Sequence, residues 1–438
     1  MTTCFDSIII GAGPCALATL SALPSNHSIA IISGSEPSFQ SPGDVHPKIR
    51  VESLESGQQP GVAGRVEPLA SKSKALYATA ITGGLANYWG QQLIHNEAND
   101  PYDTNLFKTY SEYLNECSAI ADLFTITGGD AYHKRSSLPD GFVLREPKLL
   151  SGTLNDPKAG LKAMRATIDD ATKSHTCFQL RAERISRSET NMWSVHLSDG
   201  SIVTGRKIWL AAGVIGTAQL IMNSVNGLLS ASFKDHAPYM AYVSGLKYLL
   251  KGRVSQHFNA YTLELIEKGR CEVFASIYDM SRAELNLVLG SASGMIFPFL
   301  RGVRSPSIAS LIQPVQIWTS NSFSNVKLDL KGTRYSSSKV DVTPDDGLEK
   351  VTAAITSLGG KIWHHSRTPA GLGFHYHDLQ MKLENGQLLS INSLLKQWSN
   401  GEVICSDASV LREIGLRPHT LTAMAAARCL VKQHCAID

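Results

Sequence analysis

Three small residues near the start of the chain have the spacing of a phosphate-binding turn. Gly11, Gly13 and Ala16 follow an apolar run at 5–10 and open a stretch of small residues at 16–23. Gly11 permits a tight turn, and Gly13 has no Cβ to keep a pyrophosphate away from the backbone. Ala16 fills the third position of the dinucleotide fingerprint and lets the helix pack closely on the strand. The pattern predicts a dinucleotide site, and an ordinary strand-to-helix turn is the alternative.

Histidines form the second set of residues that could do chemistry, because imidazole exchanges a proton near neutral pH. His375 and His377 are two residues apart within 373–378, so on a strand they share one face and could line one cavity. His419 follows Pro418 at the predicted start of a helix. A hydrogen-bonded structural role is the alternative for His375, and a plain first-turn position is the alternative for His419.

Other histidines and arginines suggest different roles. His364 and His365 have no acidic partner at metal-ligand spacing, so we predict no metal site. His236 is expected to brace a domain junction rather than to touch a substrate. Arg412 and Arg417 could bind an anionic substrate, although solvated charges are the simpler interpretation.

The elements that must position these residues alternate between strands and helices. After the first strand and helix, a buried strand is predicted at 29–32, and a second strand–glycine–helix unit at 207–222. A short strand at 403–405 leads into an acidic turn and a closing helix at 423–430. The other predictions for this part are an irregular excursion at 40–75, helices at 104–122 and 157–173, and a β-meander over 177–204.

The chain changes character after residue 238. Alternating runs predict an antiparallel sheet, and an amphipathic helix is predicted at 348–358. The alternating runs are at 239–250, 271–278, 284–289 and 325–330. We therefore predict an α/β protein with two domains. Residues 1–238 and 395–438 would form a Rossmann-like nucleotide-binding domain with a mixed sheet, and 239–394 an antiparallel-sheet cap over it.

Composition narrows the class of protein. The chain has 438 residues, 43% of them hydrophobic and 18% charged, with a net charge of +3 that is too small to favour a nucleic-acid partner. There is no apolar run of membrane-spanning length, and the first strand begins too early for a signal peptide. Eight scattered cysteines without a CxxC pair predict reduced thiols and a cytoplasmic location.

Taken together, the separated passages resemble the glucose–methanol–choline type of FAD-dependent oxidoreductase, including its pyranose-oxidase-like branch. The resemblance covers most of the nucleotide-binding domain and little of 239–365. Besides the fingerprint, it rests on Gly83-Gly84 with Asn87-Tyr-Trp-Gly90, Ala211-Ala-Gly213 with Gly216-Thr-Ala-Gln-Leu, Asp235-His236, Asp407-Ala-Ser, and Thr420-Leu-Thr422 with Arg428.

The resemblance implies an extended, noncovalent FAD. The first glycine turn would touch the pyrophosphate, residues 83–90 would pass the isoalloxazine, and the backbone near Ala182 would reach the adenine. Asp407 would bond the ribityl or pyrophosphate region. The helix start at Thr420–Thr422 would face the N1–C2=O edge of the flavin, where it stabilises negative charge.

Two positions depart from the family pattern. Tyr88 stands where some members attach FAD through a histidine, so the flavin is expected to be noncovalent. Ser33 replaces the acidic residue that normally holds the ribose. The residues expected to bind the cofactor are Gly11, Gly13, Pro14, Ala16, Ser33, Gly83, Gly84, Asn87, Tyr88, Trp89, Ala182, Ala212, Gly213, Asp407, Ala408, His419, Thr420 and Thr422.

The same resemblance implies oxidation of an alcohol by hydride transfer to flavin N5. His375 would be the base, with His377 where the family has glycine, and His419 would be the second donor because Pro418 has no N–H to offer. The oxidised group would be a hydroxyl of a sugar, a polyol or a natural product. Oxygen or a redox partner would accept the electrons. The alternatives are another reaction on a retained flavin, or a degenerate flavoprotein that serves as a binding subunit.

Overall fold

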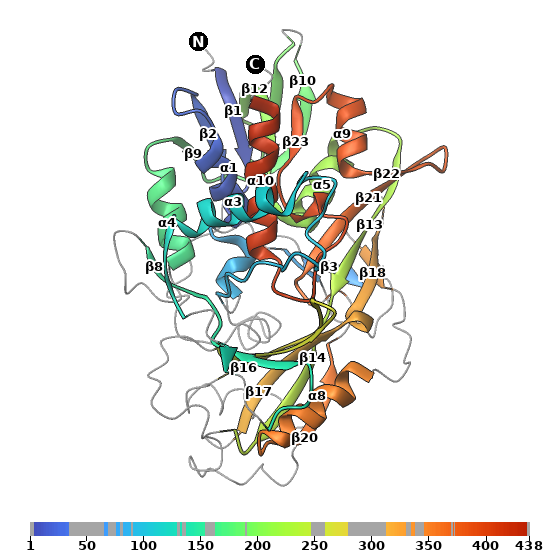
Figure 1. The fold of residues 1–438 in the computed structure, drawn as a ribbon. Helices are drawn as coiled ribbons and strands as arrows, with labels where there is room; N and C mark the ends of the chain where they lie inside the picture. The colour runs from blue at the N-terminus through green and yellow to red at the C-terminus, as the bar shows by residue number, and fades with distance from the viewer. Residues whose placement is uncertain are drawn as a thin grey trace, which may run out of the picture.

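Strands from distant parts of the chain form three large sheets. The computed structural model describes residues 4–34, 65–68, 76–78, 82–88, 91–128, 132–133, 137–153, 163–188, 191–246, 259–278, 312–329, 334–337, 346–368, 371 and 373–435. Within these residues, the strands form three sheets of seven strands and one of two. The first sheet occupies one end of the molecule, and the sheet containing β14 and β17 occupies the other (Figure 1).

The first sheet combines a parallel core with an antiparallel meander. β1 (Cys4–Ile10) pairs in parallel with β2 (Ile29–Ile32) on one side and with β12 (Ile202–Leu210) on the other. Because β1 and β2 are buried on both faces, their sequences read as near-continuous apolar runs. The other strands are β9 (Thr176–Phe178) beside β2, and β10 (Ala182–Arg187), β11 (Trp193–Leu197) and β23 (Val403–Cys405) on the side of β12.

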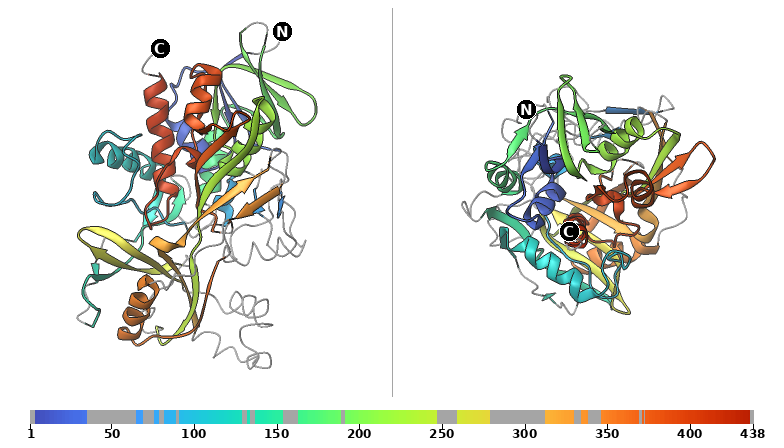
Figure 2. Two further views of the ribbon diagram at one scale, coloured as in Figure 1. Left: turned by 90° about the vertical axis from the view of Figure 1, so that its right-hand side faces the viewer. Right: turned by 90° about the horizontal axis from the view of Figure 1, so that it is seen from above.

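Three helices follow strands of this sheet. α1 (Pro14–Ala22) follows β1 and α5 (Gly213–Ser224) follows β12, while α10 (Thr420–Cys435) follows β23 after an intervening loop. Buried alanines at 423 and 425–427 let α10 pack against α1 and α3 (Tyr110–Ala121), as the view from above shows (Figure 2, right). The N-terminal ends of α1 and α5 therefore lie at the carboxyl edge of the first sheet.

The second and third sheets are antiparallel apart from one parallel pair, β19 with β3. The second sheet has the order β22 (Leu388–Ser390), β21 (Tyr376–Leu383), β13 (Leu228–His236), β18 (Phe323–Leu328), β19 (Arg334–Ser337), β3 (Arg65–Pro68) and β4 (Leu76–Tyr77). The third has the order β20 (Lys361–Arg367), β14 (Tyr239–Ser244), β17 (Ile312–Thr319), β16 (Arg270–Tyr278), β15 (Asn259–Glu267), β7 (Phe142–Arg145) and β6 (Tyr132–His133). α8 (Asp346–Ser357) packs against the third sheet.

The second sheet draws strands from both predicted domains. β21 comes from the predicted cap and pairs with β13, which belongs to the predicted nucleotide-binding domain. Only Ala237 and Pro238 separate β13 from β14, so the chain passes there from the second sheet into the third. The domain boundaries at 238 and 394 stay a prediction.

Several elements differ from the sequence-based expectation. The helix expected at 104–122 starts at Tyr110, because the Thr109 hydroxyl caps it by accepting the Glu112 N–H. The helix expected at 157–173 is described as α4 (Ala163–Thr172). The β-meander expected over 177–204 begins only at Ala182, since β9 pairs with β2 and β10 is the strand that pairs with β11.

Several described strands were not expected, and β3 and β15 are two of them. β3 lies inside the stretch expected to be irregular, and β15 lies between two runs that were expected to be strands. The run at 284–289 lies outside the described residues, whereas the helix expected at 348–358 is present as α8.

Candidate functional site

Loops from three strands meet at the carboxyl edge of the first sheet. The Ala211 N–H donates to the Ile10 carbonyl at 2.8 Å, and the Ser406 N–H donates to the Leu210 carbonyl at 2.8 Å. A Cβ on Gly11, which has a φ of +119°, would lie 2.2 Å from the Ala211 carbonyl oxygen. Gly11 is therefore required for the close approach of the β1 and β12 turns, whatever the edge binds.

Gly13 and Gly213 are constrained differently. A Cβ on either would meet no described atom within 4 Å. The Gly83–Gly84 turn lies next to Gly13. A Cβ on Gly84 would lie 3.6 Å from the Gly13 Cα, and the Gly83 N–H donates to the Ala12 carbonyl at 2.6 Å. The two predicted glycine motifs thus meet, and they leave open space beside their backbones.

Two helices begin at this edge without a side-chain cap. Gly13 is the N-cap of α1 and Ala212 is the N-cap of α5, and neither position has a capping side-chain bond. Pro14 occupies the first turn of α1, where its missing N–H costs little, and Ala16 is buried against the sheet. Helix starts of this kind attract anions such as phosphate.

Asp407 is also at this edge, but its carboxylate bonds to the protein. It accepts the Thr217 hydroxyl at 2.6 Å and the Ser409 N–H at 2.9 Å, which caps the short helix of Ala408–Val410. These bonds tie the loop after β23 to α5. The structure brings Asp407 and Ala408 to the edge that holds the glycine turns.

Ser33 directly follows β2, and the chain runs from β9, beside β2, through Leu180 to Ala182, where β10 begins at the other edge of the same sheet. The Ser33 N–H and hydroxyl donate to the Phe178 carbonyl at 3.0 and 3.4 Å, and the Gly34 N–H donates to the Leu180 carbonyl. Ala182 begins β10 two residues after Leu180. The two predicted adenosine contacts therefore lie on neighbouring segments.

The two histidines predicted to be catalytic are in contact. The rings of His375 and His419 have centroids 4.8 Å apart and an interplanar angle of 66°, an edge-to-face pair. His419 precedes α10 and its carbonyl accepts the Ala423 N–H at 2.9 Å. The expectation that His375 and His377 share a strand is wrong, because β21 starts after His375 and Phe374 has a φ of +59°.

Aromatic side chains from two other strands complete this histidine cluster. Trp318 of β17 stacks parallel to His375 with centroids 5.5 Å apart. Phe323 of β18 stacks on His236 at 4.1 Å and meets His377 edge-on at 5.8 Å. His236 lies 6.1 Å from His375, so it belongs to the cluster itself. Sequence reasoning missed Trp318 and Phe323, because no local motif links them to the histidines.

Burial keeps these histidines neutral. It lowers the pKa of His419 to about 4 and that of His377 to about 3, and it moves the pKa values of His375 and His236 well below the usual range. For His375, repulsion from the other three rings adds to the burial. In the described part of the chain, the Nδ1 atoms of His375, His419 and His236 have no hydrogen-bond partner.

Asp235 holds the loop that leads into β21. Its carboxylate accepts the Gly373 N–H at 2.8 Å, and a Cβ on Gly373 would lie 2.5 Å from the His236 carbonyl oxygen. The Tyr376 hydroxyl donates to the Gly371 carbonyl at 2.6 Å. Burial raises the pKa of Asp235 to about 6, although backbone N–H groups act in the opposite direction.

Arg417 is neither solvated nor available to a substrate, which corrects the sequence-based interpretation. Its side chain is buried and pairs with Glu264 at 2.7 Å and with Asp100. Burial lowers the pKa of Arg417 to about 10 and raises that of Glu264 to about 7. Arg412, by contrast, is exposed.

Comparison with known proteins supports the fold. No protein-family model and no curated protein matches the chain. Pyridoxine 4-oxidase from Mesorbium loti matches with 12% identity and a TM-score of 0.57, over 98% of this chain and 99% of that one. Formate oxidase from Aspergillus oryzae matches with 10% identity and a TM-score of 0.60, over 99% and 98%. The chain has the glucose–methanol–choline oxidoreductase fold.

In this fold, the glycine turns and the histidine cluster are joined through the short helix after Asp407. Ala408–Val410 packs against β21 as well as α5 and α10. Thr420 opens α10, and the Thr422 hydroxyl contacts Tyr113 at 2.9 Å, so it is bonded to α3. The loop after β23 is therefore connected to β21, which contains His377, and to α10, which follows His419.

Some predicted positions are placed only in part. Asn87 and Tyr88 belong to the short helix Gly84–Tyr88, of which only the backbone is described, and Trp89 lies outside the described residues. Within the described ranges, no group of His, Cys, Asp and Glu could hold a metal ion. No described helix is long and apolar enough to span a membrane.

Proposed function

We propose that this chain is an FAD-dependent oxidoreductase that oxidises an alcohol group of a small molecule, with His375 as the base. The observation that supports this most is the contact between two neutral histidines, one of which directly precedes α10, the helix that packs against α1. Both structural neighbours are oxidases by name, and the formate oxidase is described with a modified FAD.

The residues present at the carboxyl edge fit a dinucleotide. Open space lies beside Gly13, and the uncapped starts of α1 and α5 offer N–H groups to a pyrophosphate. Ser33 offers a neutral hydroxyl where a ribose is expected, and the Gly83–Gly84 backbone would support the ring system. Bound FAD would supply a hydride acceptor, which no side chain can provide.

The histidine cluster supplies the remaining chemistry. His375 is in its neutral form, the form that can accept the hydroxyl proton of an alcohol, while its lowered pKa makes the ring a weaker base than a free imidazole. His419 can hold the same oxygen by a hydrogen bond. Trp318 lies parallel to the His375 ring, with centroids 5.5 Å apart, and supplies an aromatic surface beside it. The residues thus divide into a proton acceptor, an orienting donor and an aromatic surface.

The absorption spectrum of the purified protein tests the proposal. Bands near ~370 and ~450 nm that follow the supernatant after acid precipitation would show a noncovalent flavin. Anaerobic bleaching of the longer band then screens primary alcohols, secondary alcohols and polyols, with formate included because one neighbour is a formate oxidase. Readmitted air tests oxygen as the acceptor. A colourless protein that takes up no added FAD would overturn the proposal.

A further inference from the structure

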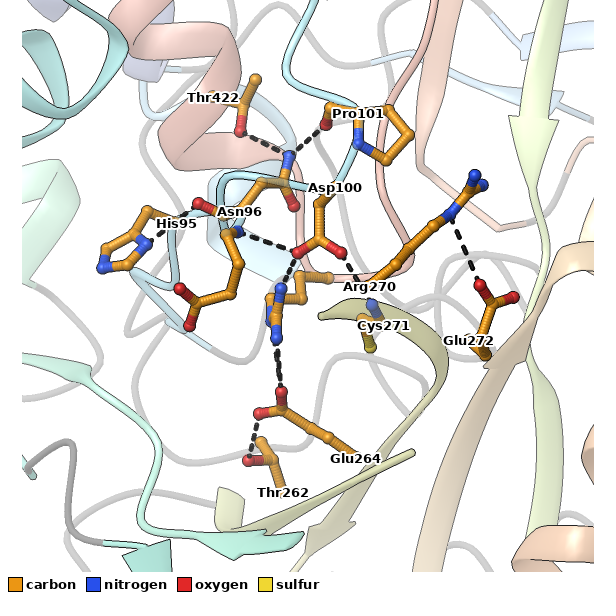
Figure 3. A network of polar contacts seen from close by, with 12 residues as sticks. His95, Asn96, Asp100, Pro101, Thr262, Glu264, Arg270, Cys271, Glu272 and Thr422 are labelled. Atoms are coloured by element: carbon orange, nitrogen blue, oxygen red, sulfur yellow. Dashed lines mark hydrogen bonds and ion pairs between the residues drawn. The ribbon is translucent and has the colours of Figure 1, made fainter. Parts of the chain in front are cut away.

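Buried charges lie next to the turn that holds His419, because Arg417 pairs with Asp100 and Glu264. Figure 3 shows these two acidic residues with their contacts. Arg417 is 1% exposed, and its two acidic partners are buried as well. Its Nη2 and Nε atoms donate to Glu264 Oε2 at 2.7 and 3.2 Å, while Nη1 donates to Asp100. Breaking such a buried group by removing one partner leaves an uncompensated charge, so the three side chains hold one arrangement. We call these three residues the buried clamp.

Each carboxylate of the buried clamp is fixed by contacts of its own. Asp100 accepts the backbone N–H groups of Cys271 and Glu97, both at 2.8 Å. Glu264 accepts the Thr262 hydroxyl at 3.2 Å through its other oxygen, which also faces Arg145. Figure 3 shows Asp100 and Glu264 reaching the contact from a loop and from β15. Arg417 therefore connects the turn before α10 to two separate parts of the structure.

The same turn is packed tightly on either side. The Arg412 N–H donates to the Asp103 carboxylate at 2.8 Å, and a Cβ on Gly415 would lie 2.6 Å from Asn96 Oδ1. Only Pro418, with its fixed φ, separates Arg417 from His419. A displacement of Arg417 should therefore also displace the backbone of His419.

We infer that Arg417, Glu264 and Asp100 are positioning residues that set the ring of His419 against His375. The inference rests on the role proposed above for these two histidines. All three side chains are buried, so we expect the buried clamp to act through His419 and not by contact with a substrate or cofactor. It acts by keeping His419 buried in the cluster at its edge-to-face angle.

Proton uptake by His419 reports its burial, because no charged side chain contributes to its depressed pKa. The test uses protein with isotope-labelled histidine, whose ring signals are followed by NMR against pH and assigned with His419→Asn. Arg417→Met removes every donor of the buried clamp, and Arg417→Lys keeps the charge but loses the multiple contacts. We expect the His419 midpoint to rise from about 4 by at least about one pH unit toward 6.5 in Arg417→Met, and by less in Arg417→Lys.

Arg428→Met is the matched control. Arg428 of α10 pairs with buried Glu116 of α3 at 3.0 Å, so we expect its loss to lower the melting temperature without moving His419. An unchanged His419 midpoint in both Arg417 variants would overturn the inference. If Arg417→Met does not fold, the His419 midpoint in Arg417→Lys decides the test. If neither variant folds, the buried clamp is needed for folding itself, and the inference that it positions His419 is overturned. The titration needs no substrate, so its failure differs from a missing flavin spectrum.

Discussion

At the scale of single residues, His375 has the properties expected of a proton acceptor. It is neutral, its Nδ1 has no partner among the described residues, and it contacts His419 and Trp318. We predict that His375→Gln lowers kcat/KM for the best alcohol by roughly 10²- to 10⁴-fold, the range of general base catalysis. Steady-state kinetics measures this, and the flavin absorbance should stay at its wild-type level.

His365→Gln is the control for this substitution. His365 is exposed on β20, so its loss should leave both turnover and flavin content unchanged. Wild-type kcat/KM in His375→Gln would contradict the proposed base and leave the fold assignment intact.

How much of the site the sequence predicts depends on whether a residue belongs to a local motif. His375 and His419 could be found because each stands at a fixed offset within a short pattern. Trp318 and Phe323 could not be found in this way. Trp318 reaches the cluster because β17 pairs with β16, and Phe323 because β18 pairs with β13. Arg417 looked like a surface charge because its partners, Asp100 and Glu264, are more than 150 residues away.

At the scale of elements, Gly11 and Gly13 of the first β–α unit are glycines for two different reasons. A Cβ at Gly11 collides with the Ala211 backbone, whereas a Cβ at Gly13 meets no described atom. We predict that Gly11→Ala lowers the free energy of unfolding by more than about 2 kcal/mol, because backbone strain and overlap add. Gly13→Ala should keep the wild-type melting temperature but retain less flavin. Thermal unfolding and flavin-to-protein absorbance ratios compare the two variants.

An equal loss of stability in both variants would contradict this distinction. Equal flavin content in Gly13→Ala and the wild type would show that the open space beside Gly13 is not a cofactor contact.

Element prediction succeeded where hydrophobic pattern and turn residues agree over a short span. β1, the α1 start and α8 follow from such local patterns. It failed at 177–185, where one stretch of the expected β-meander supplies two strands that pair with different partners. Pairing partners are set by the whole sheet, so the run itself holds no signal for the break.

At the scale of the whole molecule, the candidate site forms where the sheets meet. The first sheet contributes its carboxyl edge, the second contributes His236, Phe323 and His377, and the third contributes Trp318. Burial at this junction has opposite effects on acids and bases. It raises the pKa of Asp235 and Glu264, so their protonation favours the folded state as pH falls, whereas the histidines are folded in the neutral form.

Among these groups, we expect His419 to make the free energy of unfolding most clearly dependent on pH at acidic pH. Its pKa is about 4 in the folded protein and about 6.5 when unfolded, so the unfolded chain binds more protons between these values. The stability due to neutral His419 is therefore complete above pH 6.5 and is lost as pH falls toward 4, with about 2 kcal/mol lost by pH 5. His419→Asn lacks this proton uptake, while Asp235 and Glu264 affect both proteins alike. Urea unfolding should show the gap in unfolding free energy between wild type and variant shrinking by about 2 kcal/mol from pH 8 to pH 5. A gap of constant size would mean that His419 titrates normally and is open to water in solution.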